Sequence, residues 1–260
     1  MLHTFAICAY QESPYLEECI LSLRAQSVAS EILIATSTPN AYIEELAGRY
    51  GLPVYVNTGE HGITQDWNFA LSQVKTKYAT IAHQDDLYEP EYTERVVGEL
   101  EKTKRPIIGF TDYYETRNGL KVTDSRFLHI KRLMLAPLKP KCFRGSRFVR
   151  RRSLSLGDAI CCPSVCFCLE NVKQPVFHNK YRSAEDWEAW EKLSRQKGAF
   201  VYVPQMLMSH RIHEDSATTA IIKDHARIQE NYEMYCKFWP PFMARLINHF
   251  YTGSEKSNTL

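Results

Sequence analysis

Short apolar runs alternate with longer amphipathic stretches through the first half of the chain. The runs predict five buried strands, at residues 4–9, 31–36, 54–57, 78–82 and 106–110. After the first run, a Ser13-Pro14 start precedes apolar residues at helical spacing, which predicts an amphipathic helix. This alternation predicts an α/β fold with a mainly parallel, doubly wound sheet flanked by helices, whose connections are right-handed.

The second half of the chain is less regular. Residues 159–169, AICCPSVCFCL, predict another buried strand, and residues 201–203 and 207–209 predict two short ones. A helix is expected from about Ala217 to Phe238, where Trp239-Pro240-Pro241 breaks it. The following segment has an apolar face of Phe242, Met243, Leu246, Ile247 and Phe250. It predicts a terminal helix packed on the domain, and the alternative is a helix lying on a membrane surface.

Composition places the chain among ordinary globular proteins. It has 260 residues, of which 44% are hydrophobic and 24% charged, and its net charge of +2 says little about partners. Eight cysteines without a disulfide framework or a signal peptide predict reduced thiols in a cytoplasmic protein. No apolar run reaches the roughly 20 residues of a membrane-spanning helix, so we expect a soluble or at most peripheral protein.

Two adjacent carboxylates, Asp85 and Asp86, follow the fourth predicted strand. Ligands of open α/β sheets bind outside the carboxyl ends of the strands, and carboxylate oxygens suit Mg²⁺ or Mn²⁺. The chain contains neither GxGxxG nor GxxxxGK[ST], which argues against dinucleotide oxidoreductases and P-loop kinases. A divalent metal held by Asp85 and Asp86 is therefore the remaining way in which the protein would bind a phosphate group. The alternative is a solvated acidic turn.

Six segments in order resemble the motifs of family 2 glycosyltransferases of the GT-A fold: TFAICAYQESPYLEECILSLRAQ, EILIATS, GITQDWNFAL, HQDDLYEPEY, SAEDWEAWEKL and HRIHEDSATT. The resemblance covers about residues 4–219. It implies one GT-A domain over residues 1–219, with a nucleotide-sugar-binding half (1–112) and an acceptor half (113–219). Residues 220–260 would then form a C-terminal helical extension.

The resemblance also implies roles for particular residues. The nucleotide sugar would be bound by Ala9, Tyr10, Glu12, Thr36, Asn68, Asp85 and Arg211. The divalent metal, manganese or magnesium, would be held by Asp86 and His213. The acid pair Glu185-Asp186 would supply the catalytic base. A lone histidine is more often structural, and Ser183 with Asp186 also resembles a capping box, so both roles have a purely structural alternative.

Three positions depart from the family pattern. The chain reads Thr36-Ser37-Thr38 where an acid commonly contacts the base, Trp67 where an arginine is common, and His83 where a longer acidic motif begins. These changes affect the expected selectivity for the nucleobase more than the expected sugar-transfer reaction. Hydroxyls still bond a pyrimidine edge, and the ring of Tyr10 still offers a stacking surface.

Between Asp124 and Asp158 the chain carries basic residues and no acidic one. They are Arg126, Lys131, Arg132, Lys139, Lys141, Arg144, Arg147, Arg150, Arg151 and Arg152. This basic stretch is either a solvated face or a surface that attracts anionic lipid headgroups or the diphosphate of a lipid-linked acceptor. We do not expect nucleic acid as a partner, because the stretch contains no recognisable nucleic-acid-binding module.

Cys161, Cys162, Cys166 and Cys168 form a cluster without a CxxC pair. The run around them is apolar and strand-like, so a buried strand is expected rather than a zinc site.

The predicted function is metal-dependent transfer of a sugar from a nucleoside diphosphate sugar to an acceptor hydroxyl, with inversion. The expected acceptor is a saccharide or lipid-linked saccharide in surface polysaccharide or lipid-linked oligosaccharide synthesis. The expected place is the cytoplasm, with possible peripheral contact at the inner face of the membrane. Two alternatives remain. One is a nucleotidyltransferase, which also uses carboxylates and a metal, and the other is a non-catalytic module that binds nucleotide sugar or acts as a scaffold.

Overall fold

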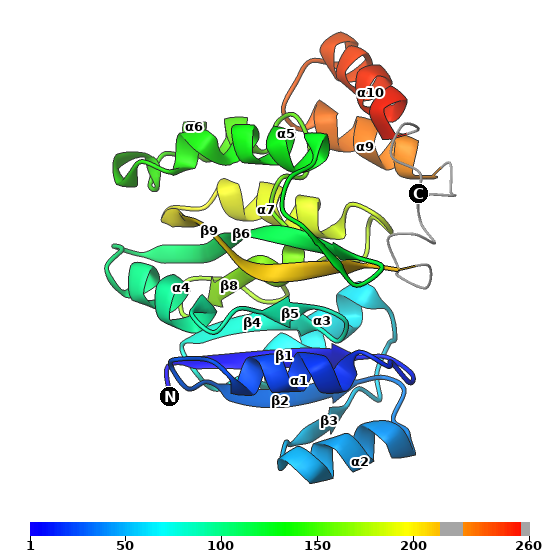
Figure 1. Ribbon diagram of the computed structural model, residues 1–260. Helices are drawn as coiled ribbons and strands as arrows, with labels where there is room; N and C mark the ends of the chain where they lie inside the picture. The colour runs from blue at the N-terminus through cyan, green and yellow to red at the C-terminus, as the bar shows by residue number, and fades with distance from the viewer. Residues whose placement is uncertain (214–225, 256–260) are drawn as a thin grey trace.

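A nine-stranded sheet runs through the whole molecule, as the computed structural model shows for residues 1–213 and 226–255 (Figure 1). The strand order is β3-β2-β1-β4-β8-β6-β9-β5, and β7 pairs with β6. The strands are β1 (His3–Ala9), β2 (Glu31–Thr36), β3 (Val54–Val56), β4 (Tyr78–His83), β5 (Leu87–Tyr88), β6 (Pro106–Arg117), β7 (Leu120–Val122), β8 (Val165–Cys168) and β9 (Ala199–Ile212).

The first four long strands form a parallel unit, as the sequence predicts. Three helices connect them: α1 (Leu16–Arg24), α2 (Ala41–Tyr50) and α3 (Ile63–Gln73). α1 buries Leu16, Cys19, Ile20 and Leu23 against the sheet. The side chain of Asn40 caps α2, and Gly51 ends it in the left-handed conformation that glycine adopts readily. This unit places the ends of β1, β2 and β4 at one edge.

The second half of the sheet is mixed. β8 lies antiparallel between β4 and β6, and β5 pairs antiparallel with β9. The longest pairing, between β6 and β9, is parallel. The two short strands predicted at residues 201–203 and 207–209 form one strand, β9. Its pairing with β6 shifts register around Asp112 and then continues to the end of both strands. The predicted α/β class and mainly parallel sheet are confirmed.

The cysteine-rich run is a buried strand only in its second part. Cys166 and Cys168 lie in β8, whereas Cys161 and Cys162 lie at the short 3-10 turn before it. Three of these four side chains are fully buried and Cys161 is partly buried. All eight cysteines belong to the described residues and are free.

Helices flank the second half of the sheet on both sides. α4 (Tyr92–Glu101) lies below β6 and β9 in Figure 1. Above these strands lie α5 (Arg126–Leu135), α6 (Arg147–Ser153), α7 (Glu185–Ser194), α9 (Ala226–Cys236) and α10 (Pro241–Glu255). The start of the predicted helix at Ala217 lies outside the described residues. The apolar residues of α9 and α10 pack on α7, where the Trp187 ring meets that of Tyr235 at a centroid distance of 5.1 Å. The predicted C-terminal extension therefore docks on the helix that begins with the acid pair.

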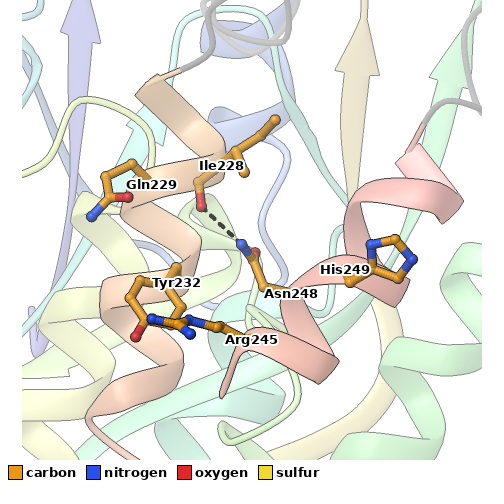
Figure 2. Close-up of a pocket in the computed structure, with 6 residues that line it drawn as sticks. All are labelled: Ile228, Gln229, Tyr232, Arg245, Asn248 and His249. Carbon is orange, nitrogen blue, oxygen red and sulfur yellow. Dashed lines mark hydrogen bonds between the residues drawn. The ribbon is translucent and has the colours of Figure 1, made fainter. Parts of the chain in front are cut away.

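The predicted apolar face of α10 is wrong in part. Ala244 and Ile247 contact the core formed with α9, but Phe242, Leu246 and Phe250 lie on the exposed side. None of the described helices is long and apolar enough to cross a membrane. Figure 2 shows a pocket of about 470 Å³ between α9 and α10, where the Asn248 amide donates to the carbonyl of Ile228 at 3.1 Å. No residue that lines it is a predicted site residue.

Part of the basic stretch is structural. Arg150 of α6 is fully buried and donates to the carbonyl oxygens of Ser194, Gln196 and Gly198, in the turn between α7 and β9. Arg144 is also buried and pairs with Glu99 at 2.9 Å. The interpretation of the whole stretch as one exposed basic surface is therefore wrong. Arg126, Lys139 and Arg147 do remain exposed.

Arg150→Met should lower the free energy of unfolding by about 3 kcal/mol or more, because three carbonyl oxygens lose their donor where water does not reach. Arg147→Met, on the exposed side of the same helix, should change it by less than about 0.5 kcal/mol. Urea unfolding of both variants measures the difference. Equal losses would contradict the structural role assigned to Arg150.

Candidate active site

Asp86 is the buried centre of the candidate site. It lies in the turn between β4 and β5 and is 0% exposed. Its Oδ1 accepts the backbone N–H of Arg211 at 2.9 Å and lies 3.3 Å from Nδ1 of His210. Its Oδ2 is buried and has no hydrogen-bond partner within the described part of the chain. A buried carboxylate oxygen without a partner is costly, which points to a ligand that the protein binds there.

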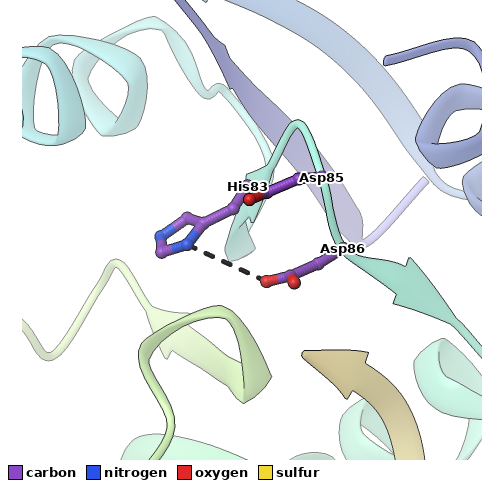
Figure 3. Close-up of side chains that lie close together, drawn as sticks. All are labelled: His83, Asp85 and Asp86. Carbon is purple, nitrogen blue, oxygen red and sulfur yellow. Dashed lines mark ion pairs between the residues drawn. The ribbon is translucent and has the colours of Figure 1, made fainter. Parts of the chain in front are cut away.

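His83 and Asp85 complete a cluster around this oxygen (Figure 3). One ligand atom from each of His83, Asp85 and Asp86 lies within 4.8 Å of the others. Nδ1 of His83 is 3.8 Å from Oδ2 of Asp86, and the Trp67 ring stacks on the imidazole at a centroid distance of 5.3 Å. Carboxylate oxygens and an imidazole nitrogen are ligands that Mn²⁺ accepts. The cluster fits a divalent metal, and His83 is a ligand that the sequence analysis did not propose.

Arg211 and His213 contact this cluster from the end of β9. The Nε of Arg211 donates to the carbonyl oxygen of Asp85 at 2.9 Å, and its NH2 group pairs with Glu18 at 2.6 Å. Its guanidinium lies over the ring of Tyr15, 4.2 Å from the centroid. Nε2 of His213 lies 3.0 Å from Oδ2 of Asp85. The structure thus places His213 against Asp85.

His210 is a site residue that sequence reasoning missed. Burial favours its neutral form, but the charge and hydrogen bond of Asp86 outweigh burial, so the pKa of His210 is raised above its usual range. The signal available in the sequence was its position next to Arg211 on the last strand. Strand periodicity turns the side chain of His210 toward Asp86, because neighbouring residues of a strand point to opposite faces.

The expected base-binding residues lie at the end of β1. Ala9 is buried, and Glu12 and Tyr10 are exposed, the latter by 55%. The Gln84 side chain accepts the N–H of Tyr10 and donates to its carbonyl oxygen, both at 3.0 Å. These two bonds tie the end of β1 to the Asp85-Asp86 turn and leave the Tyr10 ring open to a stacking partner.

A carboxylate lies beside β2 although the sequence there has none. Asp66 of α3 accepts the hydroxyl of Ser37 and the side-chain amide of Asn57, both at 2.7 Å. The hydroxyl oxygen of Thr36 accepts the N–H of Thr38 at 3.0 Å and so takes part in the turn. The sequence has no acidic residue directly after the second strand, but α3 supplies a carboxylate there, that of Asp66.

Asn68 is engaged with the protein itself. Its Oδ1 accepts the N–H groups of Val176 and Phe177 at 2.9 and 3.1 Å, and its Nδ2 donates to the carbonyl of Phe177 at 2.9 Å. These bonds hold the loop that precedes α7. The part of Asn68 in nucleotide binding stays a prediction.

The acid pair Glu185-Asp186 opens α7, as predicted. Glu185 is buried, and burial raises its pKa to about 7. Asp186 is partly exposed, and its Oδ1 accepts the N–H of Trp187 at 2.8 Å. The two neighbours therefore differ: one sits in an environment that favours the neutral acid, while the other is accessible and lies at the positive end of a helix.

The capping-box interpretation of Ser183 and Asp186 is wrong. The residue that precedes the helix is Ala184, which makes no side-chain cap. The hydroxyl of Ser183 donates instead to Glu230 at 2.6 Å. Glu230 of α9 also accepts the N–H groups of Arg182 and Ser183. A carboxylate of the C-terminal extension thus shapes the loop that delivers the acid pair.

The thiol of Cys161, just before β8, senses both the turn and the acid pair. Burial raises its pKa, and the charges of Asp86 and Asp186 add to that effect. The structure therefore gathers the carboxyl ends of β1, β4 and β9, together with the start of α7, around one region.

This arrangement matches a known family. The family model described as glycosyl transferase family 2 matches residues 4–169, more than half of the chain. The chain belongs to glycosyl transferase family 2. An uncharacterised glycosyltransferase of Rickettsia typhi is 23% identical over 248 residues, which cover 94% of this chain and 72% of the relative.

Solved structures show the same fold at low identity. TarS 1–349 of S. aureus in complex with UDP-GlcNAc has a TM-score of 0.65 and 14% identity, over 95% of this chain and 70% of that one. The mannosyltransferase PcManGT of Pyrobaculum calidifontis in complex with GDP-Man and Mn²⁺ has a TM-score of 0.63 and 15% identity, over 96% and 69%. The protein is a glycosyltransferase of the GT-A fold.

Glu185→Gln should change how stability depends on pH. The native state holds a proton on Glu185 up to about pH 7, whereas the unfolded chain releases it from about pH 4.3. As the pH rises through this range, the free energy of unfolding of the wild type should therefore fall by about 3 kcal/mol relative to that of the variant. Above about pH 7 the difference should stay constant. Urea unfolding across this range measures it.

The exposed Glu12→Gln serves as the matched control, and its difference from the wild type should stay flat. A flat difference for Glu185→Gln as well would show that Glu185 ionises normally in the folded protein.

Proposed function

We propose that this glycosyltransferase transfers a sugar from a nucleoside diphosphate sugar to an acceptor hydroxyl, with divalent-metal assistance and inversion at the anomeric carbon. The observation that carries the proposal is the buried Oδ2 of Asp86, which has no hydrogen-bond partner among the described residues and lies beside His83 and Asp85 at the carboxyl end of β4. A family 2 domain with such a cluster has a place for the diphosphate of a donor.

The proposed metal ligands are Asp86 and His83, with manganese or magnesium as the ion. When bound, the metal neutralises the negative charge that develops on the departing diphosphate. The PcManGT structure is a complex with GDP-Man and Mn²⁺, which supports a divalent ion of this kind. His213 was predicted as a second ligand. Because it already contacts Asp85, we propose that it holds that carboxylate in place and reaches the metal only if this contact opens.

The donor would lie between the end of β1 and the Asp85-Asp86 turn. Tyr10 would offer its ring to the base. Ala9, Glu12, Thr36 and Asn68 are the further residues proposed to bind the nucleotide sugar. Asp85 would face the ribose or sugar, and the guanidinium of Arg211 would lie by the diphosphate. TarS binds UDP-GlcNAc and PcManGT binds GDP-Man in their structures, which supports a nucleoside diphosphate sugar as the donor without selecting the nucleobase or the sugar.

Asp186 is the proposed base. It is partly exposed and lies at the start of α7. It would take the proton of the acceptor hydroxyl while that oxygen attacks the anomeric carbon from the face opposite the diphosphate. A single displacement of this kind inverts the configuration. Glu185, whose pKa is raised to about 7, is protonated for part of the time at neutral pH and is the weaker candidate.

The acceptor side is proposed to be residues 113–219, and the donor side residues 1–112. β6 crosses this boundary without a break, so the division is one of function. A growing surface polysaccharide or a lipid-linked oligosaccharide is the proposed acceptor. The free cysteines favour a reducing compartment such as the cytoplasm.

Peripheral contact with the inner face of the membrane is proposed only for the exposed part of the basic stretch. Arg126 and Arg147 lie near exposed apolar side chains of the same helices, Leu133 of α5 and Phe148 of α6. A bilayer with anionic headgroups would accommodate both kinds of side chain. Arg147→Met is the suitable variant for vesicle binding, because Arg150 is needed for the fold.

A panel of nucleoside diphosphate sugars with Mn²⁺ or Mg²⁺ distinguishes this proposal from its two rivals. Release of nucleoside diphosphate with a glycosylated acceptor is the expected result. Release of pyrophosphate would indicate a nucleotidyltransferase instead. Binding without any release would indicate a non-catalytic module.

Asp86→Asn should weaken Mn²⁺ binding at least tenfold and lower transfer at least a hundredfold, since the amide removes one anionic ligand without changing the shape. Calorimetric titration with Mn²⁺ measures the first effect without any donor. Asp124→Asn, an exposed acid away from the cluster, is the control. Full activity of Asp86→Asn, together with wild-type activity in chelator, would exclude the metal assignment.

Asp186→Asn should keep donor and metal affinity and lose transfer by about a hundredfold or more, because the amide cannot accept the proton. Binding is measured by thermal shift with the donor identified in the panel, and transfer by product formation. Retained configuration in the product would contradict the one-step displacement even if Asp186 proved essential.

A further inference from the structure

Trp67 is an aromatic residue of α3 that lies against the candidate metal cluster. It belongs to the face of the helix that packs on the sheet, one turn before Leu71. Its ring stacks on the imidazole of His83 with a centroid distance of 5.3 Å and an interplanar angle of 15°. Trp67 and His83 are also two of the three positions at which the chain departs from the family pattern. The structure therefore places two of these departures in direct contact.

The contact follows from the way in which α3 covers β4. Side chains of a strand alternate between its two faces, so His83, at the end of β4, faces the same way as Ala79 and Ile81. Those two residues are buried in the core to which Leu71 and Trp67 of α3 also belong. Where the strand ends, the apolar core gives way to the imidazole of His83, and the Trp67 ring packs on it.

A second ring contact restrains Trp67. The buried Phe177 meets it in a T-shaped arrangement, with a centroid distance of 4.9 Å and an interplanar angle of 63°. Phe177 lies in the loop before α7, and the side chain of Asn68 holds that loop through three hydrogen bonds to the backbone of Val176 and Phe177. Trp67 is therefore packed against an anchored loop as well as against His83, which limits the motion of its ring.

The imidazole of His83 makes no hydrogen bond to the described residues that would orient it. Its Nε2 is buried without a hydrogen-bond partner in this part of the chain. Its Nδ1 lies 3.8 Å from Oδ2 of Asp86, which is beyond hydrogen-bond distance. Histidine ligands of metals are usually oriented by a hydrogen bond from the other ring nitrogen. At His83 the stacked ring of Trp67 takes the place of that bond.

The separation of Nδ1 and Oδ2 suits two ligands of one metal ion. Ligand atoms that each lie about 2.1 Å from an ion are between about 3 and about 4.2 Å apart, depending on the angle between them. The distance of 3.8 Å from Nδ1 of His83 to Oδ2 of Asp86 falls inside this range. A nitrogen ligand favours transition-metal ions, whereas Mg²⁺ is bound mainly by oxygen ligands and keeps several waters.

We propose that Trp67 is a positioning residue for the metal site: its ring holds the imidazole of His83 with Nδ1 directed toward Oδ2 of Asp86, and the site therefore prefers Mn²⁺ to Mg²⁺. The inference rests on the proposed function, because it concerns the ion that would bind the donor diphosphate. It adds a metal preference and a residue outside the ligand set. Trp67 acts through His83 and is not itself a ligand.

Calorimetric titration of the substrate-free protein with Mn²⁺ and with Mg²⁺ tests the proposal. Trp67→Leu should weaken Mn²⁺ binding about tenfold, the loss typical of a residue that orients a ligand, and Mg²⁺ binding by less than about threefold. Trp67→Phe keeps a ring and should stay within about threefold of the wild type for both ions. Unchanged Mn²⁺ binding in Trp67→Leu, or equal losses for the two ions, would overturn the proposal.

A double-mutant cycle separates positioning from general packing. His83→Ala should lose at least as much Mn²⁺ affinity as Trp67→Leu, and the double variant should lose no more than His83→Ala alone, because Trp67 acts through His83. Additive losses would contradict this. Leu71→Val changes the same core one turn along α3 and serves as the control, in which both affinities should stay unchanged.

Electron paramagnetic resonance of bound Mn²⁺ covers the case in which Trp67→Leu fails to fold. The wild type and Trp67→Phe should show coupling of the ion to a ligand nitrogen, and His83→Ala should lose it. A wild-type spectrum without nitrogen coupling, or the same coupling in His83→Ala, would overturn the proposal.

Failure of the proposed metal assignment is distinguishable from failure of this inference. Unchanged Mn²⁺ binding in Asp86→Asn would refute the metal site as a whole. Weakened binding in Asp86→Asn together with wild-type binding in Trp67→Leu would refute only the role of Trp67.

Discussion

The hydrogen bond from the backbone N–H of Arg211 to Asp86 joins residues 125 positions apart and holds the candidate site together. It fixes the last strand against the turn that follows β4, and it uses only one of the two carboxylate oxygens. The other oxygen is buried 3.8 Å from Nδ1 of His83 and has no hydrogen-bond partner in the described part of the chain. Because a backbone donor does not depend on side-chain identity, this geometry is set by the pairing of β9 with β5 and β6.

Three acids of the site differ in burial rather than in type. Asp86 is fully buried but its Oδ1 receives a backbone N–H, and Glu185 is buried with a pKa of about 7. Asp186 is partly exposed and lies at the start of α7. Desolvation penalises the charged form of a carboxyl group, which is why burial raises the pKa of Glu185.

The C-terminal extension takes part in the site indirectly. Glu230 holds the loop before the acid pair, and Trp187 packs on Tyr235 within the same core. The position of Asp186 therefore depends on helices beyond the region that the family model matches. Arg150 acts similarly from the other side, since it binds the turn at the end of α7.

The sequence by itself determined the alternation of strands and helices, the place of Asp85-Asp86 at a strand end and the start of α7 at the acid pair. These features are local, because periodicity and helix starts depend on residues close in the chain. The sequence also predicted that Arg211 and His213 belong to the site, through motif order.

Only the tertiary structure decided which groups meet. It brought Asp66 to the end of β2 and His210 to Asp86, and each of these contacts joins residues from different elements. It also turned Arg150 inward and merged two predicted strands into β9. Burial and long-range contacts set these outcomes, and neither is encoded in a local pattern of apolar and charged residues.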